Sequence, residues 1–358
     1  MLNISEKTTK TMSSKKEILS DYKIAVESRE NSYIGRKEVF MGKAKFGIFG
    51  DGKELAQIAM ARVFREGDFR SGYYRDQTFM MAIGQLTSRQ FFAQLYAHTS
   101  VEEEPASAGR MMNGHFGTRS IDANGEWKDL TKIKNSTSDI SPTAGQMPRL
   151  LGLAYASKLY RNNEALHGYD KFSVKGNEVA FGTIGNASTS EGVFFETMNA
   201  AGVLQVPMIM SVWDDAYGIS VPSKYHTTKE SISEMLAGLQ RTKEKAGFEI
   251  IKAKGWDYEE LCAAYQKADE IARNEHVPVL VHVVEVTQPL GHSTSGSHER
   301  YKSKERLEWE ADHDCLKKMR EWLLDNKMIT AKALDELEGE AKKVAKQSRT
   351  EAWRSYTA

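Results

Sequence analysis

Short apolar runs alternate with amphipathic segments through the second half of the chain. The apolar runs indicate buried strands at residues 178–184, 206–213, 248–253 and 277–286. Between and beside them, apolar residues recur at helical spacing over residues 190–204, 229–239 and 257–274. Strands that are apolar throughout are typical of a parallel sheet with both faces covered. The pattern therefore predicts an α/β fold, a doubly wound, mostly parallel sheet with helices on both faces.

Both ends of the chain are predicted to be helical extensions of this sheet. Residues 1–15 are polar and predict a flexible arm, before helices at residues 16–31, 53–66 and 88–98. Two charged amphipathic helices are predicted at the other end, over residues 307–326 and 331–349. Residues 101–148 show weak periodicity, and a long irregular stretch of this kind is more often functional than idle. Without repeats or a proline-rich linker, residues 16–358 are predicted to be one domain.

Composition narrows the possible partners and the compartment. The 358 residues include 49 basic and 49 acidic side chains, so a nucleic acid or an anionic membrane surface is not expected as partner. Two cysteines are too few for a disulfide framework or a four-thiolate zinc site. No apolar run approaches the roughly 18 residues that span a bilayer. We therefore expect a soluble, cytoplasmic protein.

A first glycine cluster, Gly47-Ile-Phe-Gly50-Asp51-Gly52, precedes a predicted helix and suggests a nucleotide loop. Its spacing is the reverse of the dinucleotide fingerprint, and the preceding stretch is too short and too charged for a buried strand. A glycine turn that leads into a helix is the favoured interpretation. A nicotinamide-dependent reductase remains the alternative that this loop would support.

A second pair of polar turns follows two predicted strands. Residues 185–192 and residues 213–220 are rich in Asn, Asp, Ser and Gly. Where such turns meet at adjacent strand ends, their oxygens can hold a hard cation against a diphosphate, beside the positive end of the following helix. The same residue types are common in ordinary βα turns. The residues alone leave both interpretations open.

These turns resemble a family motif, and the likeness extends along the chain. Residues 185–222 follow the thiamine-diphosphate pattern that begins G-D-G and ends N-N about thirty residues later. Further matching segments appear in order: Gly52-Lys53-Glu54, Tyr74-Arg75-Asp76, Gly109-Arg110 with His115, Ser141-Pro142, and Gly291-His292-Ser293-Thr294-Ser295. Over residues 30–345 the chain resembles the α subunit of the decarboxylating dehydrogenase component of 2-oxo acid dehydrogenase complexes. The resemblance implies the thiamine-diphosphate-binding fold.

The resemblance also implies a role for each matching residue. Thiamine diphosphate would be contacted by Tyr74, Arg75, Ser141, Thr143, Gly185, Ala187, Ser188 and His292. The implied catalytic residues are His292 and His115. A Mg²⁺ ion would be held by Asn186, Asp215 and the main-chain carbonyl of Tyr217. A K⁺ ion near Ser141, Thr143 and Gln146 is a further possibility.

Several positions depart from the family pattern. Asn186 replaces the metal-binding acid of G-D-G, and Asp215 replaces the second Asn of N-N, so the pair still offers one carboxylate and one amide. We interpret this as a compensated site; a decayed, metal-free site is the alternative. Lys53 stands where the family has Gln. Trp213 stands where the branched-chain type has a basic residue, so phosphate affinity is expected to shift to other groups.

The implied function is oxidative decarboxylation of a 2-oxo acid, with transfer of the acyl group to a lipoyl acyltransferase. Residues 291–295 and the spacing of Gly109 and His115 favour a branched-chain, 2-oxoisovalerate-like substrate, with pyruvate or acetoin as alternatives. The active site would be completed by a β subunit, separate or fused, in an α₂β₂ assembly. A non-catalytic relative is the alternative of another class. Phosphorylation of Ser293 or Ser295 is left undecided.

Overall fold

A computed structural model describes residues 14–358, and within this range six parallel strands form one sheet. Their order across the sheet is β2-β1-β3-β4-β8-β7. The strands are β1 (Phe69–Ser71), β2 (Asn135–Ser136), β3 (Ala180–Gly185), β4 (Met208–Trp213), β7 (Glu249–Lys254) and β8 (Val279–Val284). Gly185 pairs with Trp213, so β3 and β4 end side by side. The turns that follow these two strands are therefore neighbours.

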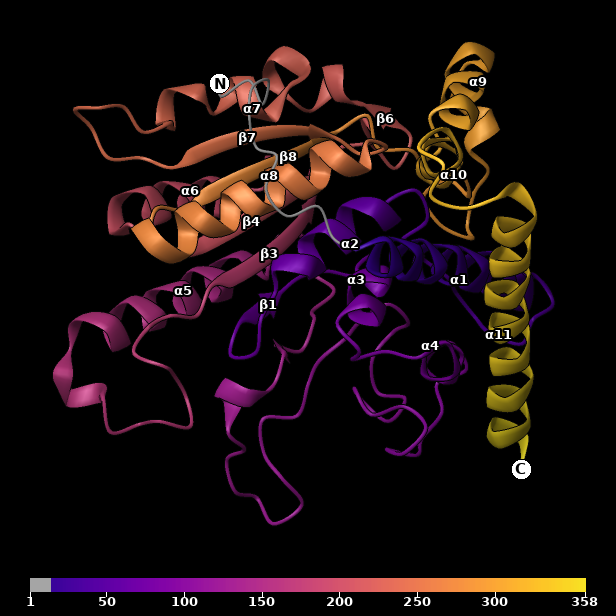
Figure 1. The fold of residues 1–358 in the computed structure, drawn as a ribbon, viewed down its shortest axis with the longest axis horizontal. Helices are drawn as coiled ribbons and strands as arrows, with labels where there is room; N and C mark the ends of the chain where they lie inside the picture. The colour runs from indigo at the N-terminus through magenta and orange to yellow at the C-terminus, as the bar shows by residue number, and fades with distance from the viewer. Residues whose placement is uncertain (1–13) are drawn as a thin grey trace.

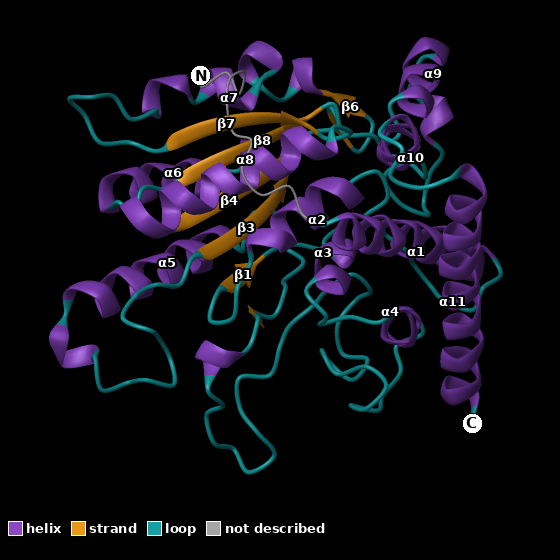
Figure 2. Cartoon of the chain, in the orientation of Figure 1, coloured by secondary structure: helices purple, strands orange, loops and turns teal. Residues whose placement is uncertain are grey.

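Helices cover both faces of the sheet, and Figure 2 shows α8 (Tyr258–Glu270) crossing in front of the strands. Ile209 of β4 belongs to an apolar cluster shared with α2 (Glu54–Val63) and α8. Met208, the preceding residue, belongs to a second cluster shared with α5 (Met147–Asn162) and α6 (Gly192–Leu204). Successive strand residues point to opposite faces, which explains the division. The predicted doubly wound α/β fold is confirmed.

One long helix and two short strands are not evident from the periodicity of the sequence. α5 begins inside the segment that we interpreted as irregular, with Pro148 in its first turn. Buried positions such as Leu150 and Ala154 do follow helical spacing, but the exposed apolar Tyr155 obscures the pattern. β1 and β2 are three and two residues long, too short for any period to emerge. They are strands because the sheet edge supplies their hydrogen bonds.

The N-terminal helices begin close to the predicted positions. α1 (Lys15–Phe40) begins at a capping box of Ser14 and Glu17 and continues beyond the predicted end. The predicted arm therefore ends before Lys15, and its residues 1–13 lie outside the described residues. α2 and α4 (Ser88–Leu95) are confirmed, with α3 (Gln77–Ala82) as a short addition between them.

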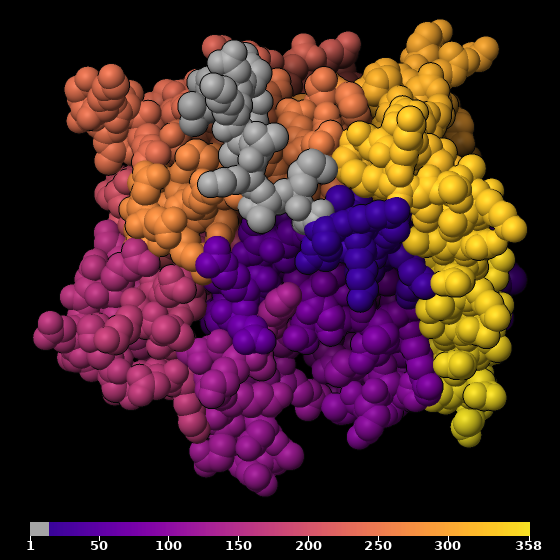
Figure 3. Space-filling model, in the orientation of Figure 1, coloured from indigo at the N-terminus to yellow at the C-terminus, as the bar shows by residue number. Residues whose placement is uncertain are grey.

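The first predicted C-terminal helix is wrong in one respect, because it is broken. α9 (Lys304–Asp312) ends before Asp314, which caps α10 (Cys315–Asp325) by accepting hydrogen bonds from two main-chain nitrogens. The same carboxylate pairs with Arg29 of α1 at 2.7 Å. α11 (Ala331–Thr357) lies against α1 and α4, and Figures 1 and 3 show α1 and α11 next to each other. The C-terminal helices thus brace the N-terminal ones.

The predicted helix at residues 229–239 is largely wrong. The structure has only a single helical turn, α7 (Ile232–Met235), flanked by short 3₁₀ turns. Lys229 and Glu230 both have positive φ, which excludes a helix through them. Upstream lies a small hairpin, β5 (Tyr217–Gly218) and β6 (Val221–Pro222). Within residues 14–358, no helix is long and apolar enough to span a bilayer.

Candidate active site

A cavity of about 480 Å³ opens at the carboxyl ends of the strands. Its walls come from the turns after β1, β3, β4 and β8, from the segments on either side of β2 and from the start of α2. The twelve residues that the resemblance assigned to catalysis, thiamine diphosphate or Mg²⁺ all line this one cavity: Tyr74, Arg75, His115, Ser141, Thr143, Gly185, Asn186, Ala187, Ser188, Asp215, Tyr217 and His292. Gln146, named for K⁺, is not among the lining residues, and its amide donates to the Thr183 carbonyl at 2.9 Å. Sequence positions up to 218 residues apart are therefore brought to one place, although their proposed roles stay predictions.

The turns after β3 and β4 are joined by main-chain hydrogen bonds. The Asn186 nitrogen donates to the Trp213 carbonyl at 3.2 Å, which extends the pairing of the two strands by one residue. Asp214 continues the link, because its nitrogen donates to Val283 of β8 at 2.9 Å. Its carboxylate accepts a 2.8 Å hydrogen bond from His282. The side chains of the two turns therefore project from a fixed edge.

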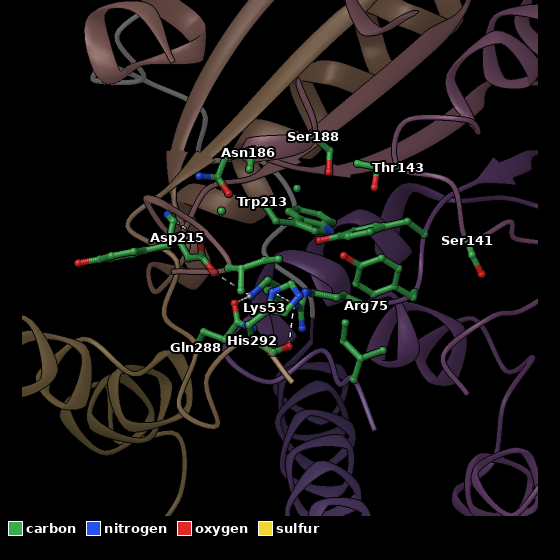
Figure 4. Close-up of a pocket in the computed structure, with 18 of the residues that line it drawn as sticks. Lys53, Arg75, Ser141, Thr143, Asn186, Ser188, Trp213, Asp215, Gln288 and His292 are labelled. Carbon is green, nitrogen blue, oxygen red and sulfur yellow. Dashed lines mark hydrogen bonds and ion pairs between the residues drawn. The ribbon is translucent and has the colours of Figure 1, made fainter. Parts of the chain in front are cut away.

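Two oxygen-bearing side chains lie on one side of the cavity, as Figure 4 shows for Asn186 and Asp215. Asn186 is only 4% exposed, yet its Nδ2 has no hydrogen-bond partner. Rotation of the amide by 180° would place its oxygen there instead. The Oδ1 of Asp215 accepts a hydrogen bond from the Tyr217 nitrogen at 3.1 Å, while Oδ2 lies 3.9 Å from Lys53. A buried amide without a partner beside a carboxylate is a fitting donor set for a hard cation.

A conventional cluster of metal ligands does not occur among residues 14–358. No group of three or more His, Cys, Asp or Glu side chains there could hold a metal ion. The candidate ligands are instead one carboxylate, one amide and one main-chain carbonyl. Such a set suits Mg²⁺ only where an anionic ligand shares its coordination, because Mg²⁺ is often bound through one or two carboxylates plus substrate phosphates.

Arg75 is buried and held in one orientation by neutral acceptors. Its guanidinium donates to the Phe49 carbonyl at 2.7 Å and to the His292 carbonyl at 3.0 Å. It also lies 3.0 Å from Nδ1 of His292 and 5.3 Å from the ring of Tyr74. The residues beside it thus leave its positive charge unpaired, in a cavity wall where a phosphate could approach.

Arg75 also sets the state of His292. Burial, with the repulsion of this guanidinium, lowers the pKa of His292 to about 4. The ring is therefore neutral near pH 7. Because Arg75 can only donate, Nδ1 of His292 must accept, and the ring proton lies on Nε2. His292 is thus prepared to donate one hydrogen bond from Nε2.

His115 and Ser141 form a second polar pair in the wall. The Nε2 of buried His115 lies 3.0 Å from the Ser141 hydroxyl, and its Nδ1 lies 3.3 Å from the Asn113 carbonyl. Thr143, two residues after Ser141, is exposed and lines the same cavity, where Figure 4 shows it beside Ser188. The loop after β8 is tied down, since Arg36 donates to the carbonyls of Leu290 and Ser293. Ser293 itself is buried.

Lys53 is one of the cavity residues that sequence reasoning did not assign to the site, and it carries a buried charge. It is 2% exposed, and burial lowers its pKa to about 8, against the attraction of Asp215. Its Nζ donates to Oε1 of Gln288 at 3.3 Å. The replacement of the family Gln by Lys53 in Gly52-Lys53-Glu54 was the available signal. The exchange of Asn186 and Asp215 is therefore accompanied by an added positive charge.

The first glycine cluster packs against neighbouring loops. A Cβ on Gly50 would lie 2.2 Å from the Arg75 carbonyl, and one on Gly52 would lie 1.9 Å from the Thr287 carbonyl. Gly52 also has a φ of +84°, which favours glycine. Residues 46–50 form no strand, so the context of a dinucleotide fingerprint is missing. The glycines instead let the start of α2 approach the other cavity loops.

Comparison with known proteins places these features in a family. A family model described as "Dehydrogenase E1 component" matches residues 23–357. The chain is 28% identical to the 2-oxoisovalerate dehydrogenase subunit alpha of Bacillus subtilis (strain 168), over 83% of this chain and 77% of that one. A mitochondrial 2-oxoisovalerate dehydrogenase subunit alpha 1 of Arabidopsis thaliana is 25% identical over 80% of this chain, which spans 52% of that relative. The pyruvate dehydrogenase E1 component subunit alpha of Rickettsia prowazekii (strain Madrid E) is 26% identical, over 85% of this chain and 82% of that one.

Proposed function

Because the chain belongs to the dehydrogenase E1 component family, we propose that it is the α half of a thiamine-diphosphate-dependent 2-oxo acid dehydrogenase. The family is thiamine-diphosphate dependent. The observation that carries the proposal is the single cavity whose wall holds Asn186 and Asp215 together with the cations Arg75 and Lys53. This arrangement pairs oxygen ligands for a metal ion with positive groups for an anion.

The residues present fit a magnesium ion and a diphosphate. The buried Asn186 amide without a partner and the Asp215 carboxylate would hold the metal, together with the Tyr217 carbonyl. Arg75 and Tyr74 would bind diphosphate oxygens, with the small residues Gly185, Ala187 and Ser188 allowing close approach. This supports a functional site over a decayed one, since a decayed site has no reason to keep an unpaired buried amide.

The chemistry divides between the cofactor and this chain. Thiamine diphosphate, when bound, supplies the nucleophilic carbon and the electron sink for loss of carbon dioxide. His292 stays neutral and offers the proton on Nε2 to an oxygen that gains negative charge. His115, oriented by Ser141, would serve as a second polar group beside the substrate.

We propose a branched-chain 2-oxo acid as the substrate. The Bacillus and Arabidopsis relatives are named for 2-oxoisovalerate, and the segment at residues 291–295 favours the same type. Pyruvate is the second candidate, because the Rickettsia relative is a pyruvate dehydrogenase subunit. Acetoin remains a third possibility.

A second chain is proposed to complete the site. Ile219 and Met112 line the cavity, yet they are 63% and 47% exposed. Tyr225 and Val221, close in sequence to Ile219, are also exposed. An apolar rim around a polar cavity is typical of a surface that a partner covers. The partner would be the β subunit, in an α₂β₂ assembly that passes the acyl group to a lipoyl acyltransferase.

The test is reconstitution with a matching β chain. The assembled protein should decarboxylate 3-methyl-2-oxobutanoate with an artificial electron acceptor, only when thiamine diphosphate and Mg²⁺ are both present. Pyruvate and acetoin serve as the competing substrates, and NAD should not raise the melting temperature. Absence of decarboxylation for every 2-oxo acid would favour the non-catalytic alternative. If a K⁺ ion binds at residues 141–146, K⁺ should raise the melting temperature and Na⁺ should not.

A further inference from the structure

Three cationic side chains line the cavity, and they differ in how well their charges are neutralised. Lys302 binds both carboxylate oxygens of Glu310, at 2.8 and 2.9 Å. Arg75 donates hydrogen bonds to main-chain carbonyls and to a neutral ring. These acceptors satisfy its N–H groups but do not neutralise its positive charge. Lys53 is the third cation, and among the described residues its ammonium group makes the fewest hydrogen bonds of the three.

The ammonium group of Lys53 is buried with most of its donors unused. Among the described residues its one hydrogen bond runs to Gln288, at 3.3 Å. The nearest carboxylate oxygen, on Asp215, is 3.9 Å away, which is too far for a hydrogen bond. An ammonium carries three donors, so two of them point to no protein acceptor. The side chain nevertheless is 2% exposed.

Nearby acidic groups do not account for Lys53. Glu54, the next residue, is engaged by Arg29 at 2.6 Å. Asp51 accepts a hydrogen bond from the Leu290 nitrogen and forms no ion pair with Lys53 in the structure. Lys53 and Arg75 instead repel each other across the cavity. Asp215, at 3.9 Å, is the nearest carboxylate to Lys53, while Asp51 and Glu54 attract it without forming an ion pair with it. Two buried cations that converge on one space with one adjacent carboxylate leave room for an anion.

Figure 4 shows the side chains of Lys53, Arg75 and His292 converging from separate elements. Trp213 ends β4 beside them and supplies an indole without charge. We propose that Lys53 is a diphosphate-binding residue, which supplies the second cation of this site together with Arg75. The inference rests on the proposed function, because the diphosphate belongs to the cofactor.

The alternative is that Lys53 merely holds Asp215 in place. In that case, removal of the lysine charge would weaken binding only through Asp215. The loss of affinity would then be the same for ligands with and without phosphate. The two possibilities separate when ligands with and without phosphate are compared. Thiamine diphosphate and thiamine share the same rings, so their ratio of affinities isolates the phosphate contacts.

The experiment measures binding to the full chain assembled with a matching β chain. Isothermal titration calorimetry at saturating Mg²⁺ gives Kd values for thiamine diphosphate, thiamine and magnesium pyrophosphate. Lys53→Gln keeps the approximate length and polarity but removes the charge, and Lys53→Arg restores it. Lys302→Gln is the matched control, because Lys302 lines the same cavity and already has a carboxylate partner. Circular dichroism checks that each variant is folded at the temperature used.

Lys53→Gln should raise the Kd for thiamine diphosphate about ten- to hundredfold, the range for a hydrogen bond to a charged group. The Kd for magnesium pyrophosphate should rise in parallel, and that for thiamine by less than about threefold. Lys53→Arg should recover at least part of the lost affinity for thiamine diphosphate. Lys302→Gln should hardly change the ratio of the Kd values for thiamine diphosphate and thiamine.

An equal loss for thiamine diphosphate and thiamine would overturn the inference. So would an effect of Lys53→Gln that disappears in an Asp215→Asn background, because Lys53 would then act only through the metal ligand. In both cases wild-type protein still binds the cofactor, and the proposed function stands. Wild-type protein that binds neither thiamine diphosphate nor magnesium pyrophosphate would overturn both proposals.

Discussion

Arg70 of β1 offers the sharpest test of how the cavity is supported. Its side chain is fully buried, and it forms ion pairs with Asp76 at 2.7 Å and Asp139 at 2.9 Å. It also donates to the Ser136 hydroxyl and to the Tyr73 carbonyl. The guanidinium therefore connects the sheet with the turn that carries Arg75. Replacement by methionine removes the charge at similar volume and leaves two buried carboxylates unpaired.

We expect Arg70→Met to lower the free energy of unfolding by about 3–5 kcal/mol, the typical effect of breaking a buried pair. With about 2.1 cal/mol/K per residue, a chain of 358 residues would lose roughly 4–7 °C in Tm. Urea unfolding followed by circular dichroism gives the free energy, and a thermal scan gives Tm. Cofactor binding should weaken as well, because Tyr73 and Asp76 flank the diphosphate-binding turn.

The stability that Arg70→Met loses should depend on pH. Burial raises the pKa of Asp139 even beside Arg70. Without the guanidinium the folded protein can relieve the unpaired charge by taking up a proton, so the loss should be largest at pH 8 and smaller near pH 5. Adding Asp76→Asn and Asp139→Asn to Arg70→Met should recover part of the stability. A loss below about 1 kcal/mol, or no recovery in the triple variant, would refute the reasoning.

Three further predictions concern the cavity itself. Asp215→Asn should raise the Mg²⁺ concentration needed for thiamine diphosphate to stabilise the protein at least about tenfold, as a melting-temperature titration would reveal. Because the pKa of His292 is lowered in the folded protein, protonation of this residue opposes folding. Its contribution to the free energy of unfolding is therefore complete above about pH 6.5 and is lost as the pH falls toward 4. His292→Gln should therefore flatten the pH dependence of the unfolding free energy in that window; an unchanged slope would contradict the assignment. Gly52→Ala should cost about 2 kcal/mol or more, because its Cβ would meet the Thr287 carbonyl at 1.9 Å and its φ is +84°. Gly339→Ala, at an open helix position, should be neutral or stabilising.

Local pattern was enough for the main strands, and the resemblance to the family supplied most of the cavity residues. The four long strands are apolar runs, and their helices show one-face spacing, so the layers followed from parallel-sheet rules. The ends of β3 and β4 had to meet at one edge, which brought Asn186 and Asp215 together. Motifs such as Tyr74-Arg75 lie at the ends of the same sheet, and all twelve predicted residues line one cavity.

Errors occurred where long-range contacts override local preference. The break at Asp314 is fixed by its pairing with Arg29, nearly 300 residues away, and by its capping of α10. An Asp N-cap is a local signal, but it is weak within a charged amphipathic run that continues on both sides. The predicted helix at residues 229–239 has helix-forming residues, yet Lys229 and Glu230 take positive φ in the turn that leads to α7. β1 and β2 exist only because a neighbouring strand completes their hydrogen bonds.

The sequence by itself determined a doubly wound fold and the two polar turns at adjacent strand ends, because each depends on spacing within a short segment. The resemblance of its motifs to the family then identified the other residues of the site. Only the tertiary structure decided that Lys53 is buried in the same cavity, since this requires Gly50 and Gly52 to let α2 pack against the loops that carry Arg75 and Thr287. The charge of a lysine is evident from the sequence. Whether water or a buried cavity surrounds that charge is set by distant segments, and this difference turns an ordinary lysine into a candidate phosphate ligand.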